Sequence, residues 1–530
     1  IRENVDLNRD ISNFIDPVIQ DFIYQNGLYL RDSQEKPLLY AGDLEFSWEE
    51  HPDAGLLDSL TAGQDNGEQI CSAITRQGEQ VLVLRRTGGE ERPLGYASYR
   101  FLSDSLLFDA LGDNELANRI RLRAAGSVLL ITSLSADERD RYKDYSQLLL
   151  SELLARALEQ DCVYAVFRPH SGQLSPQLDG LLARSGFVSL EGESPIRETD
   201  MHAPTVLIQN LETAIQEPLS HNRQVLSAIR RSHERMQLAM AGLYPGSVVL
   251  TLSSDIIHHR LLEKITACNE VPSTPTSPRV LGECMCVPFG KMLRGKIVPN
   301  TVTKTIHTDK VYSPDLKETT IEAFPNYAPI PSQIRTIKSF NRPVILVDDL
   351  MHPGFRIRTL DPIFRREGVD IRMVLVGVLS GYGKDLMRSW DRPVDSVYFL
   401  PRLRQWFVES TLYPFVGGNT VRRHNLPVPG LLPGINHILP YAVPSYQAEC
   451  GRDAVFQLSR TCLECALDVI RTLEQEYRVL YGRNLTLSRL PEAIILPLCP
   501  DKGTCLHYDP NLAPSVYLEN DLEQLLRTNA

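Results

Sequence analysis

The chain has 530 residues and a formal net charge of -11, with 43% hydrophobic and 23% charged residues. These values fit two to four packed domains and exclude a general nucleic-acid binder, which would carry a basic surface. No apolar run is long enough to span a bilayer, and IRENVDLNRD at the N-terminus does not have the pattern of a signal peptide. Ten cysteines scattered over a long chain suggest reduced thiols, so we expect a cytoplasmic protein with no membrane or nucleic-acid partner.

The first segment, residues 1–31, contains apolar stretches that end at Gly27, a plausible helix C-cap. Ile1-Arg2 and the run FIYQNGLY at 22–29 resemble the closing motifs of nucleotidyltransferases related to nicotinate-mononucleotide adenylyltransferase. The resemblance implies that residues 1–39 are the C-terminal tail of such a domain, with Arg2 as a remnant nucleotide ligand. It also implies a missing upstream nucleotidyltransferase domain. An isolated pair of capping helices is equally compatible with these residues.

In residues 40–212, alternating and periodic apolar residues predict a mixed α/β domain. Strands are expected at 81–84, 94–101, 128–133 and 162–167, and helices at 145–158 and 178–184. This order, together with LDGLLARSGFV at 178–188, resembles the GNAT acyltransferase fold over most of 68–210.

The GNAT resemblance implies a loop for the acetyl-CoA pyrophosphate in RYKDYS, formed by Arg141, Asp144 and Ser146. Asp144 stands where the family has a glycine. A carboxylate repels phosphate, and a side chain blocks close approach of the backbone. We therefore expect acetyl-CoA binding to be lost or altered, with active N-acyl transfer as the alternative.

Residues 213–244 form a predicted linker helix with four arginines, Arg223, Arg230, Arg231 and Arg235. A solvated helix packed between domains is the first interpretation, and an anion-binding face is the second. The next predicted domain covers 245–421. It begins with a strand at 248–252, a helix at 256–268 and a strand at 282–287 that runs into Pro288-Phe289-Gly290-Lys291.

The stretch VILVDDLMHPGFRIR at 344–358 organises that domain. An apolar strand meets two acids, then a glycine loop, a helix ending at Gly368 and a second strand at 371–379. This is the βαβ pattern of a parallel sheet, in which ligands bind beyond the carboxyl ends of the strands.

The same stretch resembles the phosphoribosyl-pyrophosphate loop of type I phosphoribosyltransferases. The resemblance implies that Asp348 and Asp349 orient the ribose at the catalytic centre. It further implies that five residues bind the phosphate or phosphoribosyl group: His352, Gly354, Arg356, Lys291 and Lys304. The bound pyrophosphate would carry Mg²⁺, and residues 299–314 would form a mobile hood over the site. His352 and Pro353 replace the motif's hydroxyl residues. The alternative is a Rossmann-like strand end with incidental acids and a solvated basic surface. We expect Asp348, Asp349 and Arg356 to lie at the exposed mouth of the loop.

After the second strand, SGYGKD at 380–385 predicts a glycine-rich turn. Residues 422–530 are expected to form a Pro/Gly-rich wrap at 422–448 followed by an amphipathic helix at 455–480. Cysteines and a histidine recur here: Cys450, Cys462, Cys465, Cys499, Cys505 and His507. Their uneven spacing favours buried thiols over a structural zinc, so we predict no metal site.

Together these patterns predict a multidomain α/β protein of nucleotide metabolism whose 245–421 domain binds a phosphorylated small molecule of the phosphoribosyl type. Two alternatives stay open. One is a non-catalytic sensor that regulates an upstream nucleotidyltransferase, and the other is an active N-acyltransferase.

Overall fold

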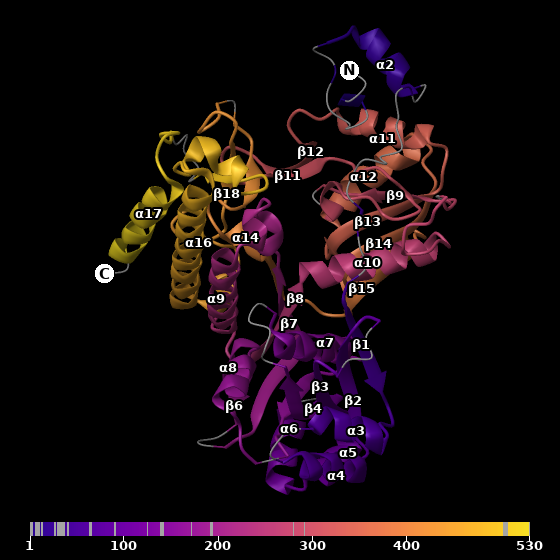
Figure 1. Ribbon diagram of the computed structural model, residues 1–530, viewed down its shortest axis with the longest axis vertical. Coiled ribbons are helices and arrows are strands. Elements are labelled where there is room, and N and C mark those ends of the chain that lie inside the picture. The colour runs from indigo at the N-terminus through magenta and orange to yellow at the C-terminus, as the bar shows by residue number, and fades with distance from the viewer. Residues whose placement is uncertain are drawn as a thin grey trace. The chain divides into compact units, whose positions relative to one another are not determined.

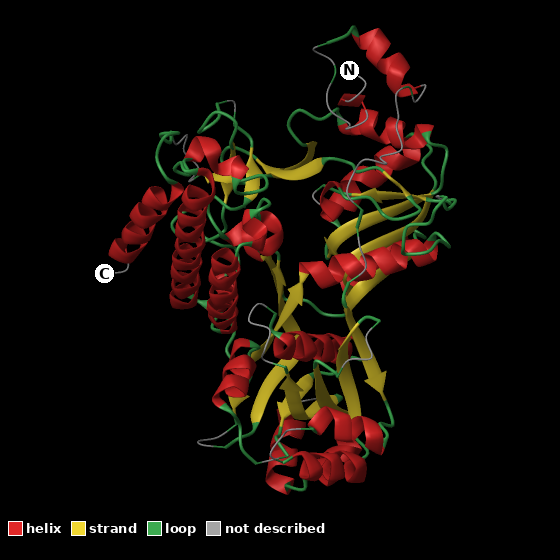
Figure 2. Cartoon of the chain, in the orientation of Figure 1, coloured by secondary structure: helices red, strands yellow, loops and turns green. Residues whose placement is uncertain are grey.

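The computed structural model describes most of the chain as an α/β protein, which confirms the predicted fold class (Figures 1 and 2). The described residues are 4–5, 11, 14–25, 28, 38–39, 42–62, 66–88, 92–123, 126–137, 143–170, 172–190, 194–278, 280–290, 292–423, 425–501 and 507–528. They divide into two compact units, Ile1–Gly42 with Asp255–Pro401, and Asp43–Ser254 with Arg402–Ala530. Among these residues, no helix combines the length and apolar character needed to cross a membrane.

The first unit is built on a parallel sheet in the order β10-β9-β13-β14-β15. The strands are β9 (Met285–Pro288), β10 (Val302–Thr303), β13 (Val344–Met351), β14 (Ile371–Ser380) and β15 (Val394–Leu400). The apolar runs of β13 and β14 are buried because helices cover both faces of the sheet.

Three helices of the first unit share one apolar cluster with the sheet: α11 (Ile330–Ser339), α12 (Phe355–Arg366) and α13 (Gly381–Ser389). Val376 of β14 belongs to that cluster. Gly377 points to the opposite face, where a Cβ would lie 2.6 Å from the Ile257 side chain of α10 (Ser254–Cys268). The glycine therefore lets α10 approach the sheet closely.

The predicted strand–loop–helix–strand order around 344–379 is confirmed, but the predicted turn at 380–385 is wrong. Helix α13 begins there, because Ser380 Oγ caps it by accepting the Gly383 N–H at 3.2 Å. A Cβ on Gly383 would lie 2.5 Å from the Met351 carbonyl oxygen. The glycines thus serve close packing and not a turn. The predicted hood, 299–314, contains β10 and β11 (Thr308–Tyr312), and β11 forms an antiparallel hairpin with β12 (Thr319–Ala323).

The N-terminal segment packs part of its apolar surface on the first unit. Val5, Ile11 and Ile23 are buried with Ala328 next to α11, whereas α2 (Pro17–Gln25) leaves Ile19 and Phe22 exposed. Arg2 and three residues of the predicted FIYQNGLY motif, Asn26, Gly27 and Tyr29, lie outside the described residues, and with Gly27 the predicted helix C-cap. The upstream domain stays a prediction.

The second unit contains a nine-stranded sheet with the main order β1-β2-β3-β4-β5-β7-β16, in which β6 and β8 also pair with β7. Its strands are β1 (Leu44–Glu49), β2 (Gln80–Arg86), β3 (Gly95–Leu102), β4 (Val128–Ala136), β5 (Tyr164–Phe167), β6 (Val188–Ser189), β7 (Arg197–Gln209), β8 (Ser247–Ser253) and β16 (Gln405–Val408). The strands predicted at 81–84, 94–101, 128–133 and 162–167 are confirmed.

Helices cover both faces of this sheet (Figure 1). One face packs on α3 (Ala54–Thr61), α4 (Gly67–Gln77), α5 (Asp104–Leu111) and α6 (Asn114–Arg123). The other face lies under α7 (Tyr145–Glu159), the helix predicted at 145–158. Val128 and Leu130 of β4 belong to the cluster with α5 and α6, so Leu129 and Ile131 face α7 by strand alternation.

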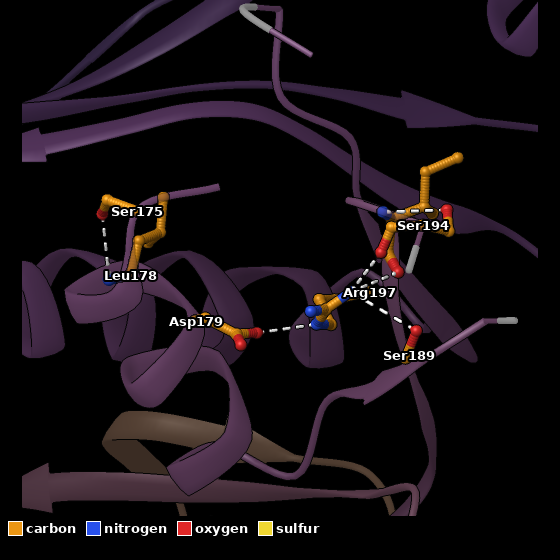
Figure 3. A network of polar contacts seen from close by, with 7 residues as sticks. Ser175, Leu178, Asp179, Ser189, Ser194 and Arg197 are labelled. Atoms are coloured by element: carbon orange, nitrogen blue, oxygen red, sulfur yellow. Dashed lines mark hydrogen bonds and ion pairs between the residues drawn. The ribbon is translucent and has the colours of Figure 1, made fainter. Parts of the chain in front are cut away.

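Helix α8 (Pro176–Arg184) is held to β7 by Arg197, the first residue of that strand (Figure 3). Arg197 donates to Asp179 Oδ1 at 2.7 Å and to the Ser194 carbonyl oxygen at 2.6 Å. The helix starts earlier than predicted because Ser175 Oγ accepts the Leu178 N–H at 3.2 Å.

The C-terminal part of the second unit is a helical layer. Helix α9 (Arg223–Ala241) lies beside α16 (Arg452–Tyr481), and α17 (Pro514–Thr528) packs on α16 (Figure 1). Cys462 and Cys465 are buried against α9, as expected for apolar thiols. Arg231 of α9 pairs with Asp468 at 3.0 Å, so the predicted linker helix is bound to the helix predicted at 455–480.

Short elements complete this unit: α14 (Glu409–Leu412), α15 (Gln447–Cys450), β17 (Asn419–Val421), β18 (Leu432–Ile435) and β19 (Leu498–Pro500). Strand β18 lies inside the predicted wrap and pairs with β17 and β19. Because β8 and β16 both pair with β7, residues 247–253 and 405–408 belong to the nine-stranded sheet, although the predicted boundaries place them in 245–421.

A buried ion pair joins α9 to α14. His233 Nε2 lies 3.0 Å from Glu409 Oε2, and Tyr413 donates its hydroxyl to Glu409 Oε1 at 3.3 Å. Burial alone would lower the pKa of His233, but the carboxylates of Glu409 and Glu212 outweigh it and raise the pKa to about 9. The imidazolium is therefore the form present at neutral pH.

We expect this pair to make stability depend on pH. Because the folded-state pKa of His233 is raised, its contribution is fully present below its ordinary pKa of 6.5 and is lost as pH rises through about 9. Urea denaturation across this range should show a loss of unfolding free energy that His233→Gln reduces. His202→Gln is the matched control, because His202 pairs with Asp200 at the surface. Equal pH dependence in wild type and His233→Gln would contradict this assignment.

Candidate functional sites

The first candidate site lies at the switch point of the parallel sheet. The chain runs outward from β9 to β10 on one side and from β13 through β14 to β15 on the other. In such sheets the crevice between the two central strands, beyond their carboxyl ends, is the ligand position. Phe289 follows β9 here, and Asp348 and Asp349 lie in the last half of β13.

Asp348 and Asp349 both face one guanidinium group. Arg356 is ion-paired with Asp348, and its Nη1 lies 3.7 Å from Asp349 Oδ1. The Asp348 side chain is 5% exposed and the Asp349 side chain 49% exposed, so the expectation of an exposed mouth is wrong for Asp348. Strand β13 does not end before the acids but continues to Met351, and Asp348 is therefore buried within the sheet. Burial would raise the pKa of Asp349, but Arg356 and hydrogen bonds lower it.

Two further residues predicted to bind the ligand, His352 and Gly354, lie close by in the chain. His352 Nδ1 lies 2.9 Å from Ser380 Oγ, which joins the ends of β13 and β14, and burial lowers the pKa of His352. Gly354 caps α12 with φ +66°, and a Cβ there would lie 2.4 Å from Leu386 Cδ2. The structure therefore brings together Asp348, Asp349 and Arg356, with Gly354 at the start of the helix that carries Arg356.

Not every basic residue that was predicted to bind phosphate is accessible to a bound molecule. Lys304 is buried, and its backbone N–H donates to the Cys286 carbonyl oxygen at 3.0 Å. Lys291 lies outside the described residues. Sequence reasoning missed the Phe289 ring, whose centroid lies 5.8 Å from the Arg356 guanidinium carbon. Its place directly after an apolar strand was the available signal.

No group of three His, Cys, Asp or Glu side chains within the described residues is arranged to hold a metal ion. Asp348 is paired with Arg356, so the half-exposed Asp349 is the carboxylate that a Mg²⁺ arriving with a pyrophosphate would contact.

The second candidate site lies in the nine-stranded sheet, where β5 leaves β4. The parallel ladder between them runs only from Val128 to Ile131 of β4. Opposite β3 the register shifts so that Thr132 is an extra, bulged residue. From Ser133 to Ala136 the ladder pairs β4 with β3. Bulges often end pairing and redirect side chains next to active sites.

A buried polar chain starts at this bulge. Thr132 donates to Glu79 Oε2 at 2.8 Å, and His170 Nε2 lies 3.0 Å from the same oxygen. Ser98 Oγ lies 2.8 Å from Thr132 Oγ1 and must be the donor, because the single Thr132 hydroxyl proton goes to Glu79. The His170 N–H donates to the Thr132 carbonyl oxygen at 3.2 Å, which anchors the histidine to the bulge. Sequence reasoning missed these residues because they come from four separate segments.

The predicted acetyl-CoA loop precedes α7, whose first turn includes Ser146. Asp144 caps this helix by accepting the Gln147 N–H at 2.9 Å, and its other oxygen lies 3.4 Å from Arg184. Arg141 lies outside the described residues. The carboxylate of Asp144 therefore accepts the backbone N–H that a pyrophosphate would bind at the N-terminus of this helix.

The two ends of α12 provide a test of the first site. Gly354 and Gly368 both have left-handed backbone, but a Cβ on Gly368 would meet nothing within 4 Å. Gly368→Ala should cost about 1–2 kcal/mol from backbone strain. Gly354→Ala should cost about 1–3 kcal/mol more, because Leu386 is buried and cannot swing away freely. Denaturant unfolding of both variants measures the difference, and equal losses would contradict the close contact.

No family model and no curated protein matches the chain. Among solved structures, the chain is similar to a mutant form of the AtaT toxin bound to the C-terminus of the antitoxin AtaR and acetyl-CoA, with 15% identity and a TM-score of 0.21 over 30% of this chain and 94% of that one. It is similar to a putative arylalkylamine N-acetyltransferase from the yellow fever mosquito, with 12% identity and a TM-score of 0.22 over 29% of this chain and 87% of that one. It is also similar to FeeM, an N-acyl amino acid synthase from uncultured soil microbes, with 13% identity and a TM-score of 0.21 over 29% of this chain and 89% of that one. Similarities this low support no conclusion about the reaction, which has to be argued from the residues of the two candidate sites.

Proposed function

We propose that residues 44–253 transfer an acyl group from a thioester to an amine. The observation that carries the proposal is the end of the parallel β4–β5 ladder at Ile131, directly before the Thr132 bulge. A pantetheine arm is extended and carries two amide groups, so it can add to the β5-facing edge of β4 as a short strand does. Its thioester would then lie near the bulge. The order of strands and helices agrees with the GNAT resemblance of the sequence.

The cap on α7 limits which thioester fits. Acetyl-CoA carries a pyrophosphate, and Asp144 holds the Gln147 N–H that would otherwise receive it. The pantetheine arm has no such charge. We therefore propose that the donor is held through its pantetheine arm and acyl group, with little affinity from the pyrophosphate of coenzyme A.

Thiol release in the presence of a panel of primary amines tests the proposal with two donors, acetyl-CoA and S-acetylpantetheine. The KM values for the two donors should be similar in the wild type. Asp144→Asn keeps a capping side chain and removes the charge, so it should lower the KM for acetyl-CoA and leave that for S-acetylpantetheine unchanged. Wild type that releases thiol from neither donor would overturn the proposal.

A second candidate function is the binding of a phosphoribosyl compound by the first unit. The specific observation is the set of Asp349, Arg356 and Gly354 at the switch point. Arg356 Nε is buried, and no described residue accepts a hydrogen bond from it. The half-exposed Asp349 carboxylate can accept from a ribose hydroxyl, while the partly exposed part of the Arg356 guanidinium can donate to a phosphate. This set supports a sensor or a transferase equally.

Titration calorimetry with ribose 5-phosphate and phosphoribosyl pyrophosphate, with Mg²⁺ present, tests this function. Asp349→Ala should weaken both ligands alike by about 1–3 kcal/mol, because a ribose hydroxyl loses its acceptor. Asp370→Ala is the control, since this exposed acid precedes β14 at the opposite end of the sheet. Undetectable binding of both ligands to the wild type would remove this candidate.

A further inference from the structure

A buried carboxylate, that of Glu79, lies directly before β2 of the nine-stranded sheet. The Glu79 side chain is fully buried and the His170 side chain is 11% exposed. Burying a charge costs free energy unless partners compensate, yet only Oε2 is partnered, because Oε1 has no hydrogen-bond partner among the described residues. This incompletely compensated carboxylate holds a histidine beside a strand bulge, which makes the pair a candidate for a functional role.

The hydrogen-bond pattern sets the tautomer of His170. An ionised Glu79 carboxylate only accepts, so His170 Nε2 must carry the proton that lies between them. In the neutral ring the lone pair is then on Nδ1. No described residue donates to Nδ1, and the His170 side chain is partly exposed beside the Thr132 bulge, where the β4–β5 ladder has ended. A carboxylate that orients a histidine in this way prepares its other nitrogen to accept a proton.

We propose that His170 is the catalytic base of the acyl transfer and that Glu79 is its positioning residue, held in turn by Thr132 and Ser98. This inference depends on the proposed function. The acceptor amine gives a proton to His170 Nδ1 as its nitrogen bonds to the thioester carbonyl carbon. The C–S bond breaks, its electron pair goes to sulfur, and the proton on Nδ1 passes to the leaving thiolate. The acceptor class is therefore an amine that enters neutral or loses its ammonium proton before the attack.

The chain supplies a matched control for this pair. His202 Nδ1 lies 2.8 Å from Asp200 Oδ1 on β7, but both side chains are more than a third exposed. This His–Asp pair resembles the His170–Glu79 pair in chemistry but is neither buried nor in contact with the bulge. His202→Ala should leave thiol release unchanged.

The experiment measures kcat and KM for S-acetylpantetheine by thiol release, with donor binding measured separately by calorimetry. His170→Ala should lower kcat by about 100-fold or more, since general bases contribute roughly 10²–10⁴-fold. Donor KM and donor affinity should not change, and added imidazole should restore part of the rate. Glu79→Gln can donate to Nε2 and so places the ring proton on Nδ1, the wrong tautomer. Its kcat should also fall, and imidazole should not restore it, because the cavity left in His170→Ala is absent.

The outcomes separate the two proposals. If the wild type binds and cleaves the thioester and His170→Ala retains the wild-type kcat, the assignment of the base is wrong while the acyl-transfer function stands. If the wild type neither binds nor cleaves it, both proposals are overturned. Loss of rate in His170→Ala without rescue, together with an unchanged melting temperature and donor affinity, would also count against a proton-accepting role.

Discussion

The backbone pairing of β7 is the constraint on which the second unit depends. Its first half, 197–200, pairs with β5, and its second half, 205–208, pairs with β8 on one edge and β16 on the other. An interior strand must satisfy hydrogen bonds along both edges, so β7 needs partners from segments that lie far apart in the sequence. This requirement draws 405–408 into a sheet whose other strands lie before residue 254.

Buried charge is compensated in three different ways in this protein. His233 and Glu409 form a pair that also receives the Tyr413 hydroxyl. Asp348 is paired with Arg356, which still has one unused donor. Glu79 accepts from Thr132 and His170 through one oxygen only. All three arrangements leave a buried polar atom without a hydrogen bond among the described residues: Glu409 Oε2, Arg356 Nε and Glu79 Oε1. The first pair joins two helices, whereas the other two groups lie at the candidate sites.

The two candidate sites follow from the same property of β-sheets. A ladder that ends or changes direction leaves backbone groups and strand-end side chains without neighbours. In the first unit this happens where the strand order reverses between β9 and β13, and in the second where β5 leaves β4. Each unit therefore carries its own candidate site.

By itself, the sequence determined the elements whose signal is local. Apolar periodicity was sufficient for the strands near 81–84 and 128–133, the helix at 145–158 and the βαβ unit around Asp348, because burial of one face leaves a periodic pattern. It did not determine that Arg356 closes on Asp348, that β13 continues through its acids, or that SGYGKD begins a helix. Only the tertiary structure decided the grouping of Ser98, Thr132, Glu79 and His170, since contacts between distant segments depend on strand order and register, and these leave no pattern in the local sequence.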